Sequence, residues 1–357
     1  MAASTVDGTG AGNGGGNYII YGADASYFTQ KALSYFAYKG IPFEYRKKTL
    51  AVQGEVEEKS GTHMIPVVVT PGGDYIWDTT PVMLGLEEKF PAGGILPATP
   101  RQRILARVLE DYLDEWVPRM VVHMRWLNDA DAETSGGAIV RDMMGVSADA
   151  ALDVPQQAIF DQVFGQLRDW GIKTCEKVGA GRGDAAQVEE ELGRFFVCLE
   201  AHLQSSKYLL GDRPSLPDFT LMGALQAHFL FDPTPRALVG QIAPSLGRYH
   251  SDMGAARAGD AGAWPLGDEI PIGLTPLLQQ IGATFMRFLP VNAAAVAAGD
   301  KELTIDLGHG PRTIATRRYT EKCRAQIAAE IAALDDVSRA SVEAILAPAG
   351  CWDAYQD

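Results

Sequence analysis

Two short motifs, Ile65-Pro66 and Asp78-Thr79, have residue types and spacing suited to binding both charged ends of a small peptide. Pro66 precedes the β-branched run Val67–Val69. Because proline cannot occupy the interior of a central strand, we expect it at the strand entrance, where an X-Pro bond can be cis. Asp78-Thr79 opens a helix-like stretch, where a carboxylate can hold an amino group and free backbone N–H groups can hold a carboxylate. The spacing predicts a site for a small zwitterionic peptide, with an ordinary helix cap as the alternative for Asp78-Thr79.

Ser26 is a candidate hydroxyl donor, because it directly precedes a stretch with helical spacing, Tyr27–Lys39. Serine commonly caps such a helix. A hydroxyl that donates to an anion also stabilises it by roughly 1.5–3 kcal/mol, and a helix N-terminus adds about 0.3–1 kcal/mol. The two roles are compatible, and Tyr21 is a second candidate donor. Lys31 could meet a ligand carboxylate, although a solvated helix face is the simpler interpretation.

Composition narrows the class of protein. The chain has 357 residues and a net charge of −14, which argues against nucleic acid and anionic membrane surfaces as partners. No apolar run reaches the roughly 18 residues that span a bilayer. The four cysteines are far apart, which favours free thiols in a reducing, cytoplasmic compartment. The six histidines show no ligand spacing, so we expect no metal.

Alternating strand and helix patterns predict an α/β domain over residues 17–92, after a flexible glycine-rich tail, 1–16. Helical spacing without a strand pattern predicts an all-helical domain over 103–253, with helices at 103–127, 155–177, 185–206, 216–230 and 244–253. Ser215 and Asp218 form a capping-box pattern at the fourth of these helices.

The C-terminal part of the chain is expected to form a small α+β extension. A linker over 254–274 precedes the extension, 275–357, for which we expect a helix, a hairpin and two further helices. Strands at 302–307 and 313–317 flank the glycine-rich turn of that hairpin, and the last two helices cover 319–334 and 336–346. No role in function follows from this segment.

A set of motifs over residues 17–253 resembles the glutathione transferase superfamily. The motifs, in order, are Tyr21-Gly22, Ser26–Lys31, Lys39–Glu44, Ile65-Pro66, Asp78-Thr79 and Ser215–Phe219. The resemblance implies a thioredoxin-like N-terminal domain followed by a helical domain of the type found in glutathione transferases, with the extension lying beyond the usual two-domain chain. It also implies glutathione as co-substrate and a homodimer.

The resemblance assigns roles to the motif residues. The backbone of Ile65, before a cis Pro66, would pair with the cysteinyl part of glutathione. Asp78 and Thr79 would hold its γ-glutamyl end, and Ser26 would donate a hydrogen bond to its sulfur. Two residues depart from the pattern: Asp24 places an anion near that sulfur, and Met64 replaces a polar ligand-binding residue.

The helix over 103–127 would face the cleft of such an enzyme. Its aromatic and methionine side chains could form an apolar wall for an electrophile, with core packing as the alternative. The predicted pocket residues are Tyr27, Tyr112, Trp116, Met120 and His123. The acidic residues Glu110, Asp111, Asp114 and Glu115 are expected on a solvated face. The resulting hypothesis is a glutathione transferase acting on hydrophobic electrophiles. Its alternatives are a glutathione-dependent lyase or isomerase and a non-catalytic binding protein of the same fold.

Overall fold

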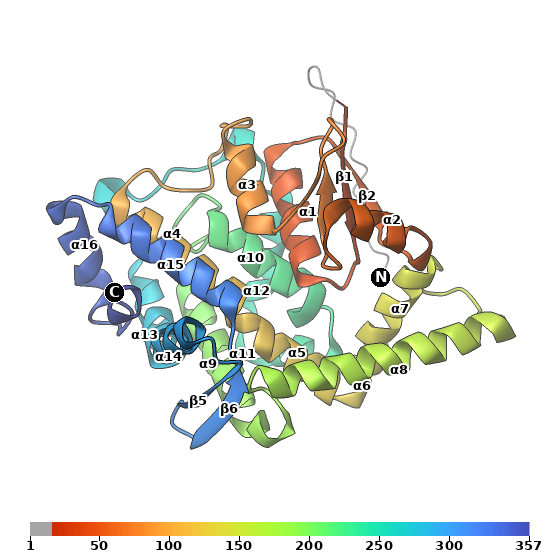
Figure 1. Cartoon of the computed structure of the whole chain (residues 1–357). Helices are drawn as coiled ribbons and strands as arrows, with labels where there is room; N and C mark the ends of the chain where they lie inside the picture. Colours follow the sequence, from red (N-terminus) through yellow and green to blue (C-terminus); the bar gives the residue numbers. More distant parts are fainter. Residues whose placement is uncertain (1–15, 357) are drawn as a thin grey trace.

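The computed structural model describes residues 16–356, so the predicted tail lies outside the described part of the chain apart from Gly16. A small sheet lies beside a larger group of helices, and the C-terminal segment, coloured blue in Figure 1, runs alongside α4. Both the sheet and the helical group were predicted from the sequence.

The N-terminal sheet has four strands in the order β2-β1-β3-β4. β2 pairs parallel to β1, whereas β3 pairs antiparallel to β1 and to β4. This is the predicted thioredoxin-like arrangement. The elements in chain order are β1 (Tyr18–Gly22), α1 (Tyr27–Lys39), β2 (Phe43–Lys47), α2 (Leu50–Ser60), β3 (Val67–Val69), β4 (Tyr75–Trp77) and α3 (Thr79–Glu87).

Alternate strand residues face two different apolar layers. Ile20 and Val68 belong to the main core, which also includes residues of α1 and α3. Tyr21, Val67 and Val69 point the other way and form a smaller cluster with Val56 of α2. Because side chains alternate across a strand, short β-branched runs can serve both layers.

The helical part packs closely on α1. Its elements are α4 (Pro100–Glu115), α5 (Val117–Leu127), α6 (Asp129–Asp131), η1 (Ala132–Gly136), α7 (Gly137–Met144), α8 (Val154–Lys177), η2 (Arg182–Asp184), α9 (Ala185–Leu203), α10 (Leu216–Ala224), η3 (Leu225–Phe229), α11 (Pro233–Ile242) and α12 (Ser245–Ala255). A Cβ atom at Gly223 of α10 would lie 2.4 Å from the backbone oxygen of Tyr27. Only glycine permits this approach of α10 to α1.

The single helix predicted over 103–127 is two helices in the structure. The break falls at Trp116, whose φ of −113° departs from helical geometry. Pro118 follows within the first turn of α5. Because proline has no N–H, it cannot donate to a carbonyl of the preceding turn, which ends α4.

Eight helical elements and a hairpin make up the described part after α12. They are η4 (Ala258–Asp260), η5 (Leu266–Asp268), η6 (Ile272–Leu274), α13 (Thr275–Ala283), α14 (Phe285–Ala298), β5 (Glu302–Asp306), β6 (Pro311–Ala315), α15 (Arg318–Ala332), α16 (Asp336–Leu346) and η7 (Asp353–Tyr355). The predicted hairpin is confirmed, with Gly308 and Gly310 at φ 104° and 91° in its turn. The one helix expected before the hairpin is the pair α13 and α14.

Within residues 16–356, the stretch Leu266–Ala298 is long and apolar enough to cross a membrane by length and composition, in contrast to the prediction from the sequence. Half of its most apolar window is buried inside the protein. Leu277 and Ile281 of α13 and Phe285 and Phe288 of α14 belong to the main core. Helices α13 and α14 are therefore buried in the same way as ordinary core helices.

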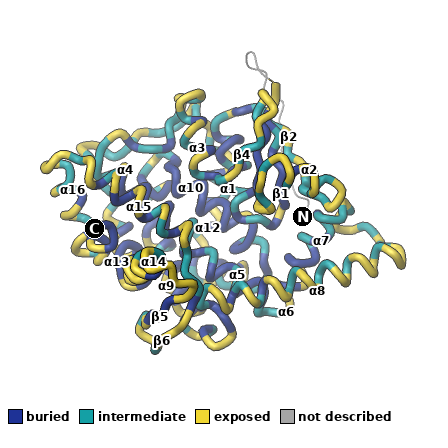
Figure 2. Tube along the Cα trace, viewed as in Figure 1, coloured by how far each residue is buried: buried dark blue, intermediate teal, exposed yellow. Residues whose placement is uncertain are grey.

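Helix α15 packs along α4 and covers its acidic side. Glu110 and Asp111 are buried, in contrast to the solvated face expected for them. Figure 2 shows many exposed residues along the outer elements α16 and α8. The local pattern of α4 could not reveal this cover, because α15 comes about 200 residues later in the chain.

Candidate functional site

A cavity of about 380 Å³ lies where three parts of the chain meet. The N-terminal domain contributes Phe28 of α1, the loop residues Met64, Ile65 and Pro66, and Trp77, Asp78 and Thr79 at the end of β4 and the start of α3. The helical part contributes Asp114, Glu115, Pro118, Arg119, Val122, Thr174 and Val178. The third part is the C-terminal segment, through Arg317 and Tyr319. All four residues predicted to hold glutathione therefore line one cavity.

Ile65 presents a free backbone edge to this cavity. The Ile65-Pro66 bond is cis. Ile65 lies outside β3, and within residues 16–356 its N–H and C=O make no hydrogen bond to another backbone group. Backbone groups normally find a partner, so an extended peptide could pair here.

Asp78 occupies the N-cap position of α3, but its side chain caps nothing. Its φ of 77° and ψ of 103° are rare for a residue other than glycine, and its carboxylate accepts no hydrogen bond from the helix. Such a conformation costs on the order of 1–3 kcal/mol and is typical of functional sites. The carboxylate instead accepts a hydrogen bond from the Tyr319 hydroxyl, and Lys322 Nζ lies 4.0 Å from Asp78 Oδ2.

Ser26 caps α1 and is not part of the cavity wall. Its Oγ accepts a hydrogen bond from the backbone N–H of Thr29 at 3.3 Å. Phe28, two residues further, does line the cavity. Asp24 is exposed, and Lys47 Nζ lies 3.1 Å from its Oδ2, which offsets the negative charge. Tyr21 belongs to the cluster on the α2 side of the sheet.

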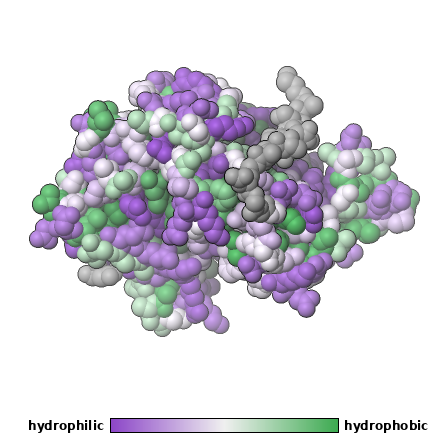
Figure 3. Space-filling view, turned by 90° about the horizontal axis from the view of Figure 1, so that it is seen from above, coloured by the Kyte–Doolittle hydropathy of each residue, from purple (hydrophilic) through white to green (hydrophobic). Residues whose placement is uncertain are grey.

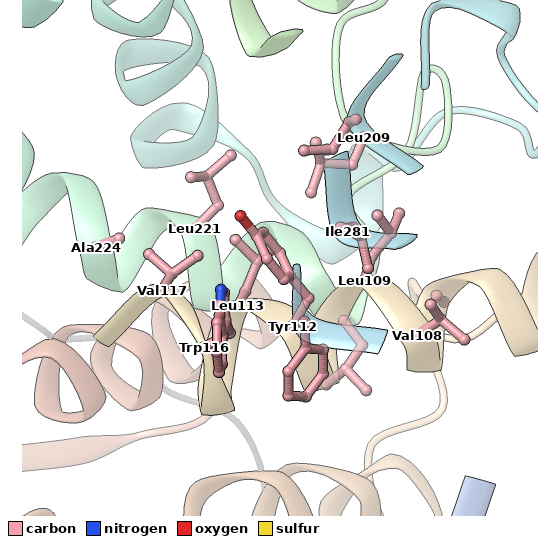
Figure 4. Packing of buried hydrophobic residues seen from close by; sticks show 14 of the residues in the cluster. Val108, Leu109, Tyr112, Leu113, Trp116, Val117, Leu209, Leu221, Ala224 and Ile281 are labelled. Atoms are coloured by element: carbon pink, nitrogen blue, oxygen red, sulfur yellow. The ribbon is translucent and has the colours of Figure 1, made fainter. Parts of the chain in front are cut away.

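The five residues predicted to line the substrate pocket are in the protein core instead. Trp116 Nε1 donates to Glu191 at 2.6 Å, and the Tyr27 hydroxyl donates to the carbonyl of Leu113 at 2.9 Å. His123 Nδ1 lies 2.7 Å from the carbonyl oxygen of Ala180. Figure 4 shows Tyr112 and Trp116 packed among Leu113, Leu221 and Ile281, and Met120 is fully buried.

The cavity-facing residues of α4 and α5 are sequence neighbours of these core residues. Glu115 lines the cavity from the end of α4, and Pro118 and Val122, four residues apart, line it from one face of α5. The aromatic stripe points away from the cavity and packs inward. This stripe therefore packs in the core, and the prediction that it forms an apolar wall of the substrate pocket is wrong.

The cavity is lined by apolar side chains together with a few polar groups. Phe28, Trp77, Pro118, Val122 and Val178 contribute apolar surface. Met64 and Trp77 are 52% and 45% exposed, so they form an accessible apolar rim. Over the face in Figure 3, hydrophobic residues form groups among hydrophilic ones.

A buried cluster of charges supports the floor of the cavity. Lys31 is fully buried, and its Nζ lies 2.9 Å from Glu110 and 2.6 Å from Asp114. Burial raises the pKa of Asp114 to about 8 even though Lys31 opposes the shift. For Glu110, Lys31 and Arg107 outweigh burial and lower the pKa to about 2. Lys31 is thus a structural cation, not part of a solvated face.

Comparison with known proteins agrees with this geometry. The family models for the glutathione S-transferase N-terminal and C-terminal domains match residues 20–94 and 176–255. The isoprene-epoxide glutathione S-transferase of Rhodococcus sp. (strain AD45) is 27% identical over 214 residues, which cover 57% of this chain and 80% of that protein. The chain belongs to the glutathione transferase superfamily.

Two solved structures illustrate the range of similar proteins. The beta-etherase LigF from Sphingobium sp. strain SYK-6 is 18% identical with a TM-score of 0.45, covering 68% of this chain and 97% of that one. A glutathione S-transferase from Methylobacterium radiotolerans, solved with glutathione sulfonate, is 19% identical with a TM-score of 0.40, covering 71% and 100%. Residues 256–357 lie outside both family models.

Proposed function

We propose that this protein is an enzyme that conjugates the thiolate of glutathione to a hydrophobic electrophile. The observation that carries the proposal is the joint position of Ile65-Pro66 and Asp78-Thr79 on one wall of a cavity whose rim is apolar. The similarity to an isoprene-epoxide glutathione S-transferase supports an electrophile such as a small epoxide.

Each group at the site would have a distinct part in binding glutathione. The unpaired backbone of Ile65 would pair with the cysteinyl residue. The Asp78 carboxylate would hold the γ-glutamyl amine, because Oδ1 has no hydrogen-bond partner within residues 16–356 and only Oδ2 is used by Tyr319. Thr79 begins α3, and the free N–H groups of that first turn would hold the γ-glutamyl carboxylate.

The sulfur would then lie near the start of α1, where Ser26 is the candidate donor. A free thiol has a pKa near 8.5, so only a few per cent is thiolate at neutral pH. Hydrogen bonding from a hydroxyl, together with the N-terminus of α1, would lower the thiol pKa by about one to two units. The same thiolate could serve a glutathione-dependent lyase or isomerase.

A second candidate is a glutathione-binding protein without catalysis. It is favoured by one observation: Ser26 does not line the cavity, and its oxygen already accepts a hydrogen bond from Thr29.

A homodimer and a cytoplasmic location are also proposed, the latter because all four cysteines are unpaired.

Two measurements separate the candidates. Glutathione at 100 times its Kd should stabilise a binding protein by about 2.7 kcal/mol, seen as a rise in Tm. Turnover with isoprene oxide and 1-chloro-2,4-dinitrobenzene then distinguishes an enzyme from a binder. Absence of a shift at millimolar glutathione refutes both, whereas a shift without turnover of any electrophile supports the binding protein.

A further inference from the structure

The part of the chain outside the family models contributes directly to the cavity proposed to bind glutathione. Tyr319, the second residue of α15, lines the cavity and is 40% exposed in spite of its position between packed helices. Its hydroxyl donates to Oδ2 of Asp78, the carboxylate expected to hold the γ-glutamyl amine. One hydrogen bond thus joins residues 241 positions apart at the centre of the site.

The residues on either side fix Tyr319 in this position. The backbone N–H and C=O of Arg317 bond to the buried amide of Asn292 at 2.8 and 2.9 Å. The Arg317 guanidinium donates to the carbonyl of Glu115 at 2.7 Å and lies over the ring of Trp116. Thr320, which is buried, donates its hydroxyl to the Glu115 carboxylate.

The chemistry of this contact suits a cationic ligand group. Burial raises the pKa of Tyr319, so its hydroxyl stays protonated and donates to Asp78 without neutralising it. Because the Tyr319 hydroxyl is neutral, its hydrogen bond to Oδ2 leaves the negative charge of the Asp78 carboxylate in place. Oδ1 is then available to an ammonium group. Lys322 competes weakly, because its Nζ is 4.0 Å from Oδ2 and its side chain is 54% exposed.

We propose that Tyr319 is a positioning residue of the glutathione site, which orients the Asp78 carboxylate toward the γ-glutamyl amine. The inference rests on the proposed function. It makes the site a joint product of α3 and the C-terminal segment, and it assigns a role to residues beyond both family models. The competing possibility is that the hydroxyl occupies the carboxylate and must leave before glutathione binds.

The test compares Tyr319→Phe with a matched control, Tyr355→Phe. Tyr355 also lies in the C-terminal segment and donates to a buried aspartate, Asp111 at 3.2 Å, but it is not part of the cavity. Calorimetric titration measures the Kd of glutathione and of N-glutaryl-cysteinylglycine, which is glutathione without its amino group. Each Kd is measured for the wild type and both variants.

Tyr319→Phe should raise the Kd of glutathione about five- to thirtyfold, because it removes a hydrogen bond to a charged group. The Kd of the analogue should stay within twofold of the wild type, since there is no amine to position. Tyr355→Phe should leave both values unchanged. Comparing two ligands on one variant cancels any general loss of folding.

Three results would overturn the inference. An unchanged Kd for glutathione in Tyr319→Phe would leave the hydroxyl without a role, and a lower Kd would identify it as a blocking group. An equal loss for glutathione and the analogue would indicate a merely structural effect. If the wild type itself fails to bind glutathione, the proposed function fails first, and this outcome is recognised without any variant.

Discussion

Lys31 Nζ lies 2.6 Å from Asp114 Oδ2 and 2.9 Å from Glu110 Oε1, in a position where none of the lysine side chain is exposed. Lys31 belongs to α1 and both acids belong to α4, so this contact joins the two main parts of the protein. Thr80 of α3 accepts a third hydrogen bond from the same nitrogen at 2.8 Å.

Replacing Lys31 with methionine should destabilise the protein by roughly 3–5 kcal/mol, because two buried carboxyl groups lose their cation. The midpoint of urea unfolding, followed by circular dichroism, measures the effect. Lys59→Met is the control: Lys59 pairs with Glu55 at 2.5 Å on the surface of α2. We expect its cost to stay below about 1 kcal/mol. Similar midpoints for the two variants would contradict the prediction.

His228 makes stability depend on pH. Burial and Arg125 lower its pKa to about 4, although Asp232 at 3.4 Å opposes the shift. The ring of Tyr27 also packs against it. A depressed pKa means that the unfolded chain binds a proton first, near pH 6.5. The contribution of neutral His228 to the free energy of unfolding is therefore present above pH 6.5 and is lost as pH falls toward 4. The loss is on the order of 3 kcal/mol.

Chemical unfolding from pH 7.5 to 4 checks this dependence against His228→Gln. The variant should lose less stability over that range than the wild type, whatever its stability at pH 7.5. Parallel curves for both proteins would assign the acid sensitivity to other groups.

The approach of α10 to α1 can be tested at Gly223. Alanine there would place a Cβ 2.4 Å from the backbone oxygen of Tyr27, so we expect a loss of roughly 1–3 kcal/mol. Gly165 in the exposed face of α8 has no atom within 4 Å of such a Cβ. Gly165→Ala should instead stabilise the protein by about 0.4–1 kcal/mol. We therefore expect the Tm to fall in Gly223→Ala and to rise in Gly165→Ala. A higher Tm in Gly223→Ala would refute the packing argument.

Asp78→Asn should weaken glutathione binding about tenfold or more, since it removes the charge that meets the amine. Asparagine tolerates the positive φ of this position, so the backbone should persist. Asp74→Asn, on the exposed turn between β3 and β4, is the control. An unchanged Kd in calorimetric titration of Asp78→Asn would remove the carboxylate from the site.

Two substitutions separate the possible roles of Ser26. Asparagine is a good N-cap without a hydroxyl, whereas threonine keeps both the cap and the hydroxyl. If Ser26 donates to the sulfur, Ser26→Asn should raise the pKa of bound glutathione by about one to two units and Ser26→Thr should not. Thiolate absorbance against pH gives this pKa. Equal values in both variants would leave Ser26 as a cap alone.

The sequence signals for the N-terminal wall of the cavity are local. A proline before a valine run, and Asp78-Thr79 before a helix, fix their own backbone conformations. The cis bond at Ile65-Pro66 and the shared cavity follow from them. The same holds for the hairpin with Gly308 and Gly310, whose positive φ values require such residues.

The rest of the site depends on contacts that no local pattern records. The stripe of Tyr112 and Trp116 has the spacing of a helix face, but spacing alone does not say which face meets a cavity and which meets α9 and α14. Glu110 and Asp111 have the pattern of a solvated face because their buried partners, Lys31 and Tyr355, are distant in sequence. Tyr319 carries no motif, so its place beside Asp78 could be found only in three dimensions.

The link between Asp78 and Tyr319 has a consequence for protein synthesis. A ribosome completes the sheet and α3 early, yet the third wall of the cavity does not exist until Tyr319, 241 residues after Asp78, has been translated. A nascent polypeptide therefore carries an unfinished pocket through most of its elongation, and ligand affinity should arise only as the final helices emerge and dock.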